Sequence, residues 1–280
     1  MISVLVKLRE YSPQASPTEK VIIKYILEDP KKVTKMTVYT LSEMTFSSPA
    51  SIIRMCKKIG FSGFKEFIKA LIYELAMRSN QQEEHISDIS KQDTIEDIVN
   101  KVTYRNIISL EDSKNIIDID TLGKCLNLLK NSKSICLFGI GSSLNVAKDA
   151  QQKFMRLNKN CKLNEDWHLQ LLTARNMSNN DIGIIISYSG QTIEMIECAK
   201  AMKENYVKII SITKYGLSPI VELSDYNLFV AAHESTFRSG AMSSRISQLN
   251  IIDILYTCFA NTEYEKSLEL IAKTHIRKDK

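Results

Sequence analysis

The chain of 280 residues contains only 9 glycines and 5 prolines, while 44% of its residues are hydrophobic and 25% are charged. This balance excludes disordered and fibrous proteins, which depart strongly from the composition of a folded chain. No segment approaches the roughly 18 uninterrupted apolar residues that a membrane-spanning helix requires. The sequence therefore predicts a globular, cytoplasmic protein with no membrane partner, long enough to form two domains.

Cysteine is present, but its spacing does not indicate a cysteine-based site. The six cysteines are scattered, mostly within apolar patterns, and they form no CxxC pair and have no neighbouring histidine that would complete a metal site. We expect free, buried thiols in a reducing compartment, without a metal or another cofactor.

The net charge of +5 hides an uneven distribution. Residues 1–78 contain 13 Lys and Arg against 7 Asp and Glu, whereas residues 79–280 contain 24 against 25. A basic segment joined to a nearly neutral one suggests a polyanion as the partner of the first and a smaller ligand for the second. A merely solvated basic surface is the open alternative.

The basic segment is predicted to form short helices. Ser16, Pro17 and Glu19 make a capping start for the first amphipathic helix, which ends near Asp29. A second short helix is expected over residues 37–45. A third begins with Ser48 as its cap and ends at Gly60, and a fourth covers residues 61–78.

The third helix is expected to span about 11 residues, or about 16 Å, which is long enough to lie across a DNA major groove. Ile52, Ile53 and Cys56 are predicted to face inward. The basic residues of the helix then lie on its outer face.

A helix, a polar turn and a second helix with exposed basic residues are typical of a helix-turn-helix DNA-binding domain. Contacts to phosphates of double-stranded DNA are expected from Arg54, Lys57 and Lys58. Contacts to base edges are expected from Ser47, Ser48 and Ser51, with Arg54 reaching a guanine edge. A helical bundle that serves dimerisation is the alternative.

Residues 79–93 turn polar and are expected to link a domain of residues 1–78 to a second domain of residues 94–280. Two helices are expected at 94–115 and 119–131. Beyond them, apolar strands alternate with helices, with strands expected at 134–141, within 159–166, and at 181–187, 207–213 and 226–232. This alternation predicts an α/β domain with a parallel sheet covered on both faces.

Two loops between a strand and a helix have the residues of an anion site. In "GIGSSLNVAKD" (139–149), Gly139 and Gly141 permit a tight turn, and Ser142 and Ser143 follow with hydroxyls and helix amides. In "SYSGQT" (187–192), four hydroxyls surround Gly190, from Ser187, Tyr188, Ser189 and Thr192.

Both loops are expected at the carboxyl ends of strands, where open α/β sheets bind ligands. Unpaired N–H groups and the helix dipole favour a dianion there, so hydroxyls suffice to hold a phosphate without an arginine. NAD is not expected, because Leu144 replaces the last glycine of the dinucleotide fingerprint. A capped helix without a ligand is the alternative for the second loop.

The run "SSPASIIRMCKKIGFSGFKEF" (47–67) resembles the helix-turn-helix signature of the RpiR family of bacterial transcription regulators. One position departs from it: Phe46 stands where this family commonly has glycine in the turn. A left-handed backbone at a bulky residue costs on the order of 1 kcal/mol. We therefore expect either a different turn or one stabilised by packing of the ring.

"GIGSS", "ISYSGQT" and "SGAMSSRISQLNIIDILY" (239–256) resemble the sugar isomerase (SIS) domain of the same regulators, so the resemblance covers nearly all of the chain except the linker. It implies a flavodoxin-like, five-stranded parallel α/β sandwich that binds phosphosugars. The residues implied at the ligand are Gly141, Ser142, Ser143, Ser187, Ser189, Gly190, Thr192 and, for the sugar, Glu234. Asp166, Trp167 and His168 are further candidates to approach the ligand, with a structural role as the favoured alternative for the Trp–His pair, and Arg238 and Arg245 are expected to pair with acids.

These features predict a regulator of carbohydrate metabolism, not an enzyme, whose affinity for operator DNA is controlled by a phosphosugar effector. We expect a homodimer or homotetramer in which the ligand shifts helices at the subunit interface. A phosphosugar isomerase or etherase with Glu234 or His233 as its base is the alternative, followed by an assembly module that does not bind DNA. Neither enzyme explains the basic helix-turn-helix segment.

Overall fold

The computed structural model of the protein describes residues 3–77, 89–234 and 241–275. Its contacts divide the chain into two compact units, Met1–Tyr104 and Arg105–Lys280, so the division falls inside helix α7 (Ile95–Ile116). Of the expected linker, residues 79–88 lie outside the described residues and residues 89–93 precede α7. Each unit is described by itself.

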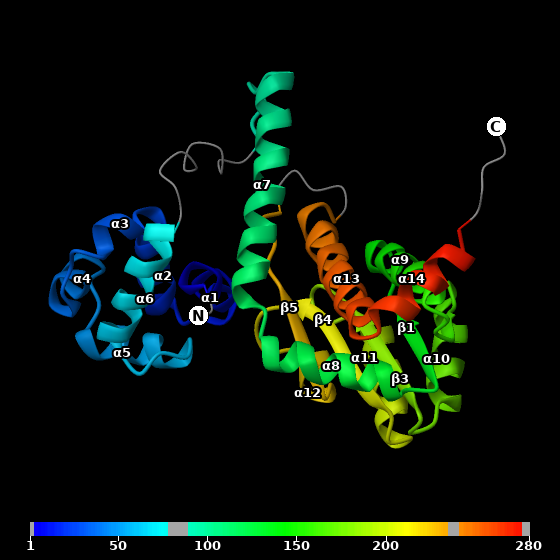
Figure 1. Ribbon diagram of the computed structural model, residues 1–280. Coiled ribbons are helices and arrows are strands. Elements are labelled where there is room, and N and C mark those ends of the chain that lie inside the picture. The colour runs from blue at the N-terminus through cyan, green and yellow to red at the C-terminus, as the bar shows by residue number, and fades with distance from the viewer. Residues whose placement is uncertain (1–2, 78–88, 235–240, 276–280) are drawn as a thin grey trace. The chain divides into compact units, whose positions relative to one another are not determined.

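The first unit is helical, as expected (Figure 1). Its elements before α7 are α1 (Val4–Tyr11), the 3-10 helix η1 (Ser12–Gln14), α2 (Pro17–Glu28), α3 (Pro30–Val33), α4 (Val38–Met44), α5 (Pro49–Lys58) and α6 (Phe64–Met77). The start predicted for α2 is confirmed, because Ser16 and Glu19 form a reciprocal capping box.

Helix α1 is absent from the sequence-based prediction. Its N-terminus is held by Glu74 of α6, whose carboxylate accepts hydrogen bonds from Ser3 Oγ (2.7 Å) and Val4 N (2.5 Å). Its apolar residues are buried in the core of the unit, with Leu8 fully inaccessible. Lys7, which interrupts the apolar run, is also buried, and its ammonium group lies 4.4 Å from the centre of the Phe61 ring.

The inward face of α5 differs from the prediction in one residue. Ile52 and Cys56 are buried as predicted, but Ile53 is 37% exposed and Met55 is buried instead. Residues 52, 55 and 56 have the i, i+3, i+4 spacing of one helical face, whereas residue 53 is rotated away from that face. The prediction for Ile53 was therefore wrong.

The turn before α5 keeps a left-handed residue without glycine. Phe46 has a φ of 47°, and its ring is 97% exposed, so both expectations for this turn were wrong. Hydrogen bonds fix the turn: Ser47 N donates to Ser42 O (2.9 Å), and the hydroxyls of Thr45 and Ser47 are bonded to each other (2.8 Å).

The second unit holds the predicted sheet of five parallel strands, in the order β2-β1-β3-β4-β5. The strands are β1 (Ser134–Phe138), β2 (Cys161–Leu163), β3 (Asp181–Ile186), β4 (Lys208–Lys214) and β5 (Tyr226–Val230). The helices after α7 are α8 (Ile119–Asn131), α9 (Ser142–Arg156), α10 (Trp167–Asn176), α11 (Ile193–Glu204), α12 (Pro219–Leu223), α13 (Ser243–Thr262) and α14 (Tyr264–Lys273). Helices α12 and α14, like α3, are absent from the sequence-based prediction.

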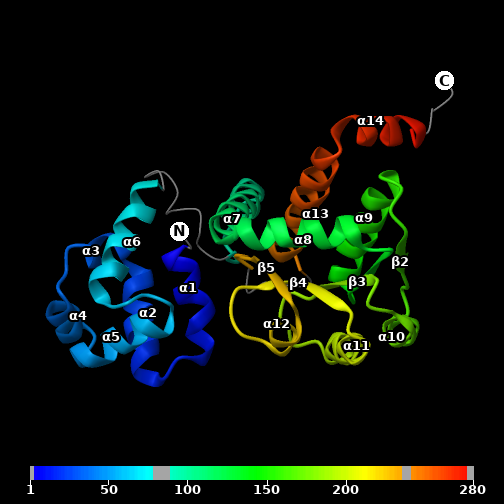
Figure 2. The ribbon, with the colours of Figure 1, turned by 60° about the horizontal axis from the view of Figure 1, so that its bottom comes forward.

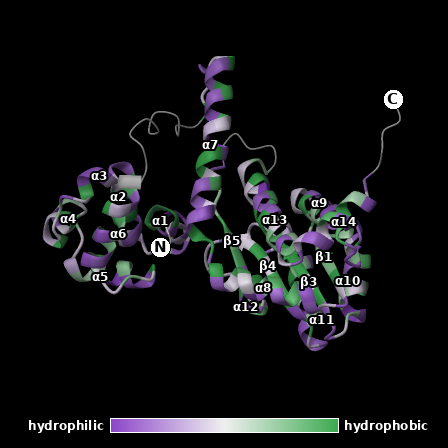
Figure 3. Ribbon diagram, viewed as in Figure 1, coloured by the Kyte–Doolittle hydropathy of each residue, from purple (hydrophilic) through white to green (hydrophobic). Residues whose placement is uncertain are grey.

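Helices cover both faces of the sheet (Figure 2), and each face forms a hydrophobic core with them. One core joins the sheet to α8, α9 and α13 and includes Phe154, while the other joins it to α10, α11 and α12 and includes Phe138. The central strands are strongly hydrophobic (Figure 3), as expected for strands covered on both faces. All six cysteines are free and four are buried, as predicted.

The strand order places a ligand-binding edge between β1 and β3. The connection after β1 leads to β2 on one side of the sheet, whereas the connection after β3 leads to β4 on the other side. Such a switch point opens a crevice at the carboxyl ends of the strands. Phe138 pairs with Ile185, so the loops that follow β1 and β3 emerge side by side.

Candidate anion pocket and nucleic-acid interface

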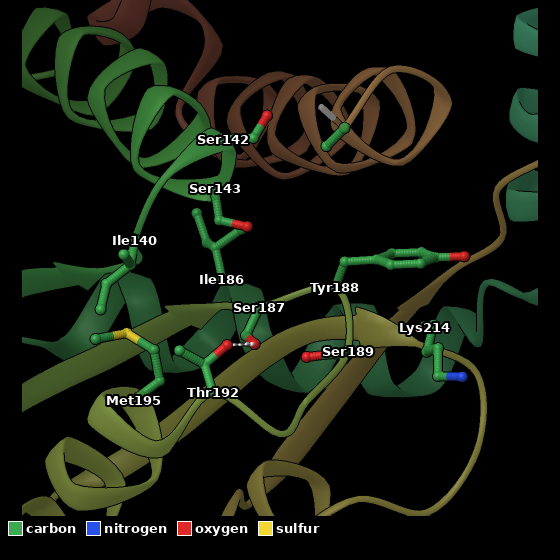
Figure 4. Close-up of a pocket in the computed structure, with 11 residues that line it drawn as sticks. Ile140, Ser142, Ser143, Ile186, Ser187, Tyr188, Ser189, Thr192, Met195 and Lys214 are labelled. Carbon is green, nitrogen blue, oxygen red and sulfur yellow. Dashed lines mark hydrogen bonds between the residues drawn. The ribbon is translucent and has the colours of Figure 1, made fainter. Parts of the chain in front are cut away.

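A cavity of about 500 Å³ opens at this edge of the sheet (Figure 4). It is lined by Ile140, Ser142, Ser143, Ile186, Ser187, Tyr188, Ser189, Thr192, Met195, Lys214 and Ala241. The two predicted loops therefore meet at one cavity, and five of the predicted ligand-binding residues line it.

The first loop passes from β1 into α9 through two glycines. Gly141 has φ 60° and ψ −124°, a conformation essentially limited to glycine. A Cβ at Gly139 would lie 3.0 Å from Ser143 O, so this glycine lets the loop fold closely onto the start of the helix. The side chain of buried Gln170 holds the loop, because it bonds both Gly139 N (3.1 Å) and Gly139 O (3.0 Å).

The second loop turns at Gly190, which has a φ of 66°. A Cβ there would lie 2.1 Å from Ser218 Oγ, so only glycine fits. The loop is held by backbone hydrogen bonds from Lys214 N to Tyr188 O (2.8 Å) and from Ile220 N to Gly190 O (3.3 Å). Of the three glycines singled out in the sequence, Gly139 and Gly190 are thus required by close contacts and Gly141 by its backbone conformation.

Residues with hydroxyl side chains from the two loops line the same cavity. Figure 4 shows Ser142 and Ser143 on α9 opposite the hydrogen-bonded pair of Ser187 and Thr192, whose oxygens are 3.1 Å apart. Ser142 Oγ is buried and has no hydrogen-bond partner. A buried polar atom without a partner is costly, which makes this hydroxyl a candidate for a bond to a ligand.

The two helices that start at the cavity lack a side-chain cap. Neither Gly141 before α9 nor Thr192 before α11 supplies a capping hydrogen bond, whereas Asp118 and Asp166 cap α8 and α10. The first-turn amides of α9 and α11 are therefore not capped by a side chain of the N-cap residue, although Leu144 N and Met195 N donate to the carbonyls of Gly141 and Thr192. Together with the positive end of each helix dipole, the first-turn amides favour an anion.

Sequence reasoning missed Lys214, the one charged side chain among the described residues that line the cavity. It is the last residue of β4, so it reaches the same edge of the sheet as the loops after β1 and β3. Its position at a strand end was the signal that could have identified it. The lining therefore combines hydroxyls, one cation and the apolar side chains of Ile140, Ile186 and Met195.

Glu234 does not line the cavity. Its carboxylate accepts hydrogen bonds from Ser244 N (3.0 Å) and Ser244 Oγ (2.5 Å), as well as from Met242 N, and so caps α13. Its contact with a sugar stays a prediction. His233 Nε2 lies 2.7 Å from the carboxylate of buried Asp112, also away from the lining.

The remaining residues considered near the ligand have other contacts. Asp166 accepts a hydrogen bond from Leu169 N (3.1 Å), and the rings of Trp167 and His168 contact each other. An approach of these residues to a ligand stays a prediction. Arg238 lies outside the described residues, and Arg245 is exposed on α13, where an acidic partner for it stays a prediction.

In the first unit, the start of α5 presents a polar face. Ser48 Oγ accepts from Ser51 N (3.1 Å), and Arg54 donates to Ser51 Oγ (3.3 Å), so these three side chains lie along one side of the helix. Arg54 and Lys57 are exposed, and Ser47 lies in the turn just before the helix. The structure thus brings together the predicted DNA contacts with one exception.

The exception is Lys58. Its ammonium group donates to Glu19 Oε1 (2.8 Å) and thereby ties α5 to α2. Although burial opposes it, hydrogen bonds from Lys58, Ser16 and Tyr11 lower the pKa of Glu19 to about 2. A phosphate contact by Lys58 stays a prediction, and it would compete with this ion pair.

Comparisons with known proteins identify both domains. The model of the helix-turn-helix domain, rpiR family, matches residues 2–78, and that of the SIS domain matches residues 128–258. An uncharacterized HTH-type transcriptional regulator of Caldanaerobacter subterraneus subsp. tengcongensis is 37% identical, over 98% of this chain and 96% of its own.

Two solved structures extend the comparison. The NanR protein of Vibrio vulnificus, complexed with ManNAc-6P, is 26% identical and superposes with a TM-score of 0.60 over 97% of this chain and 96% of its own. A proposed sugar-phosphate isomerase from Listeria monocytogenes is 19% identical, with a TM-score of 0.57 over 64% of this chain and 97% of its own, and shows the fold alone. In the described residues, no helix is long and apolar enough to cross a membrane.

Proposed function

The chain belongs to the RpiR family of helix-turn-helix transcription regulators with an SIS domain, and we propose that a sugar phosphate bound in the SIS domain controls its affinity for operator DNA. The helix-turn-helix domain accounts for the basic first unit. The open question is what the cavity binds and how its occupancy reaches the DNA.

The buried hydroxyl of Ser142 carries the proposal for the ligand. It lacks a partner in a cavity where two uncapped helices begin and where Ser143, Ser187, Ser189 and Thr192 supply further hydroxyls. A phosphate satisfies these donors together, and each hydrogen bond to its charge contributes roughly 1.5–3 kcal/mol. The cavity volume of about 500 Å³ suits a phosphorylated sugar.

A chain of hydrogen bonds supports coupling between the cavity and α7. Ser143 Oγ donates to Gln248 Oε1 of α13 (3.4 Å), and the preceding residue, Ser247, donates to Ala231 O (2.8 Å). Ser113 of α7 bonds the same carbonyl (3.1 Å) and accepts from Ala231 N (3.0 Å). A ligand that forms a hydrogen bond with Ser143 disturbs this chain of hydrogen bonds. In the sequence, α7 is the helix that follows the DNA-binding domain and the linker.

The mechanism is one of linkage. A sugar phosphate that draws the two serine loops together shifts α9 and α13, and thereby α7 and the helices that face a second subunit. A coupling free energy of about 1–3 kcal/mol changes operator affinity roughly 5- to 150-fold. We propose a dimer as the minimal unit, because operators are commonly two-fold and place half-sites about 34 Å apart.

A paired binding assay tests this function in the full-length protein. A duplex selected by the protein from a random-sequence pool is titrated by fluorescence anisotropy, with and without each member of a panel of hexose, pentose and amino-sugar phosphates. We expect one phosphate to change the Kd for the duplex about 5- to 150-fold. The matching sugar without phosphate is the control and should change nothing.

Arg54→Ala separates the two halves of the proposal. The variant should lose most of its affinity for the duplex and keep wild-type affinity for the sugar phosphate, because Arg54 is exposed on α5 in the other unit. The slope of log K against log salt should fall by about 1 if Arg54 contacts a phosphate. Full DNA affinity in this variant would contradict the contact.

An isomerase remains the second candidate because the SIS fold also occurs in a proposed sugar-phosphate isomerase. Proton abstraction from a sugar needs a base within about 3 Å of the carbon. His233 and Glu234, the two candidates, do not line the cavity and are bonded to Asp112 and to the start of α13. Turnover of a sugar phosphate, together with no duplex selected from the pool, would favour the enzyme.

A further inference from the structure

The turn between α4 and α5 holds an exposed aromatic ring on a strained backbone. Phe46 combines a φ of 47° with 97% exposure, so no packing within the unit compensates for the left-handed conformation. Glycine or asparagine would adopt this conformation more easily. Strain that the fold does not use is a reason to look for a function of the side chain.

The surroundings of the ring identify what it can contact. Phe46 precedes Ser47 and Ser48, which lie at the start of α5, and farther along the helix follow half-buried Ser51 and the exposed side chains of Arg54 and Lys57. The first 78 residues carry 13 basic against 7 acidic side chains, so the partner of this face is a polyanion. A phenyl ring gains nothing from phosphates, but the major groove offers one apolar group, the methyl group of thymine.

We propose that Phe46 reads thymine in the operator: its ring contacts the 5-methyl group of a thymine next to the bases contacted by the start of α5. This inference rests on the proposed DNA binding and adds a residue that specifies sequence. The operator half-site then contains an A·T pair at that position. The left-handed turn aims the ring out of the protein toward the groove.

Replacement of thymine by deoxyuridine tests the contact, because it removes the methyl group and nothing else. Each dT of the selected duplex is replaced in turn by dU, and the Kd of the full-length protein is measured by anisotropy. We expect one dU position that weakens wild-type binding about fivefold. Phe46→Gly and Phe46→Asn should bind the unmodified duplex about fivefold more weakly and show no further loss at that dU.

The same variants report the strain. Both should raise the melting temperature of the first unit by a few degrees, because they relieve the left-handed conformation and remove no packing. Agreement between the two variants excludes a merely floppier turn as the cause of the DNA effect. Tyr73→Ala, which removes a 54% exposed ring from α6, is the matched control and should leave DNA binding unchanged.

Three outcomes would overturn the inference. Phe46→Gly could bind the duplex like the wild type, the dU penalty could be equal in variant and wild type, or the variant could change the mass of the assembly in light scattering. The last result would assign the ring to a contact between copies of the chain. If the wild type selects no duplex at all, the proposed function itself fails, and the inference fails with it.

Discussion

The serines at the starts of α5 and α9, one helix in each unit, differ in the hydrogen bonds of their hydroxyls. At α5, Ser48 turns its hydroxyl onto Ser51 N and closes the helix end from within the chain. At α9, the N-cap residue Gly141 supplies no side-chain cap, and the buried hydroxyl of Ser142, the next residue, has no hydrogen-bond partner. The same residue type thus caps one helix and, in the proposed function, binds a ligand at the start of the other.

The two sites also differ in how they use charge. The polar face of α5 exposes Arg54 and Lys57, which suits a long polyanion whose phosphates lie outside the protein. The cavity holds one lysine and relies on hydroxyls and helix amides, which can surround a small dianion on several sides. Cations on an exposed helix face suit a polymer that lies outside the protein, whereas dipoles around a cavity suit a small ligand that the protein encloses.

The largest effect is expected when a methyl group is added to the second loop of the cavity. In Gly190→Ala, the new Cβ would meet Ser218 Oγ at 2.1 Å on a backbone with φ 66°, so the loop must move. We expect a loss of about 2–4 kcal/mol in the stability of the second unit and no measurable binding of a sugar phosphate. Fluorescence of Trp167, the single tryptophan, follows unfolding of this unit in urea.

Gly123→Ala is the matched control within the same unit. Gly123 lies inside α8 and a Cβ there meets nothing within 4 Å, so alanine should stabilise the helix by about 0.5–1 kcal/mol. Ligand binding should stay at the wild-type level. Equal stability of the two variants would show that the loop tolerates a side chain and is not sterically fixed.

The comparison also shows what sequence can predict. The sheet and both serine loops were predictable because apolar runs, glycines and hydroxyls form patterns that can be recognised within a few consecutive residues. Gln170, which clamps Gly139 from 31 positions away, is a contact that only the fold creates. Helix α1 was missed for a similar reason, since Lys7 looks like a break in an apolar run until Phe61 covers it.

Reliance on residue type set a second limit on prediction. Ile53 was placed in the core because it is apolar, but the buried face of α5 passes through Met55, and Ile53 is left 37% exposed. Glu234 illustrates the same limit for a polar residue, because its position after the last strand gives no sign that its carboxylate caps α13. Residue type alone does not decide which of several partners a side chain reaches.

A pair of serine variants tests the difference between the two helix starts, with a smaller expected effect on stability. Ser142→Ala removes a buried hydroxyl that has no partner, so stability should stay constant or rise slightly, while affinity for the sugar phosphate falls about 10- to 150-fold. Ser48→Ala removes a cap and should cost about 1 kcal/mol of stability in the first unit without changing ligand affinity. Calorimetric titration and urea unfolding followed by circular dichroism measure the two quantities.

The opposite pattern would refute the assignment of roles. If Ser142→Ala destabilised the protein and bound the ligand normally, its hydroxyl would be a structural group like that of Ser48. If Ser48→Ala left stability unchanged, the cap would contribute nothing and the serines of α5 would differ from those of α9 only in their exposure. Either result removes the contrast between the two helix starts.

The smallest expected effect concerns acid, and it should appear in the first unit alone. The ion pair with Lys58 contributes to holding the pKa of Glu19 near 2, below its ordinary value of 4.5. A carboxyl whose pKa is depressed by folding stabilises the protein above its unfolded pKa and loses that contribution as the pH falls toward its folded value. The stabilisation from Glu19 is therefore full above about pH 5 and declines toward pH 2.

Glu19→Gln should lower the stability of the first unit by about 1 kcal/mol at pH 7, an amount limited by the half-exposed Lys58. The difference from the wild type should vanish near pH 2, where Glu19 itself becomes protonated. Circular dichroism should register the change in urea unfolding, and the fluorescence of Trp167, in the second unit, should not. A constant deficit at every pH would mean that Glu19 acts through its hydrogen bonds to Ser16 and Tyr11, which glutamine disturbs whether or not the acid is charged.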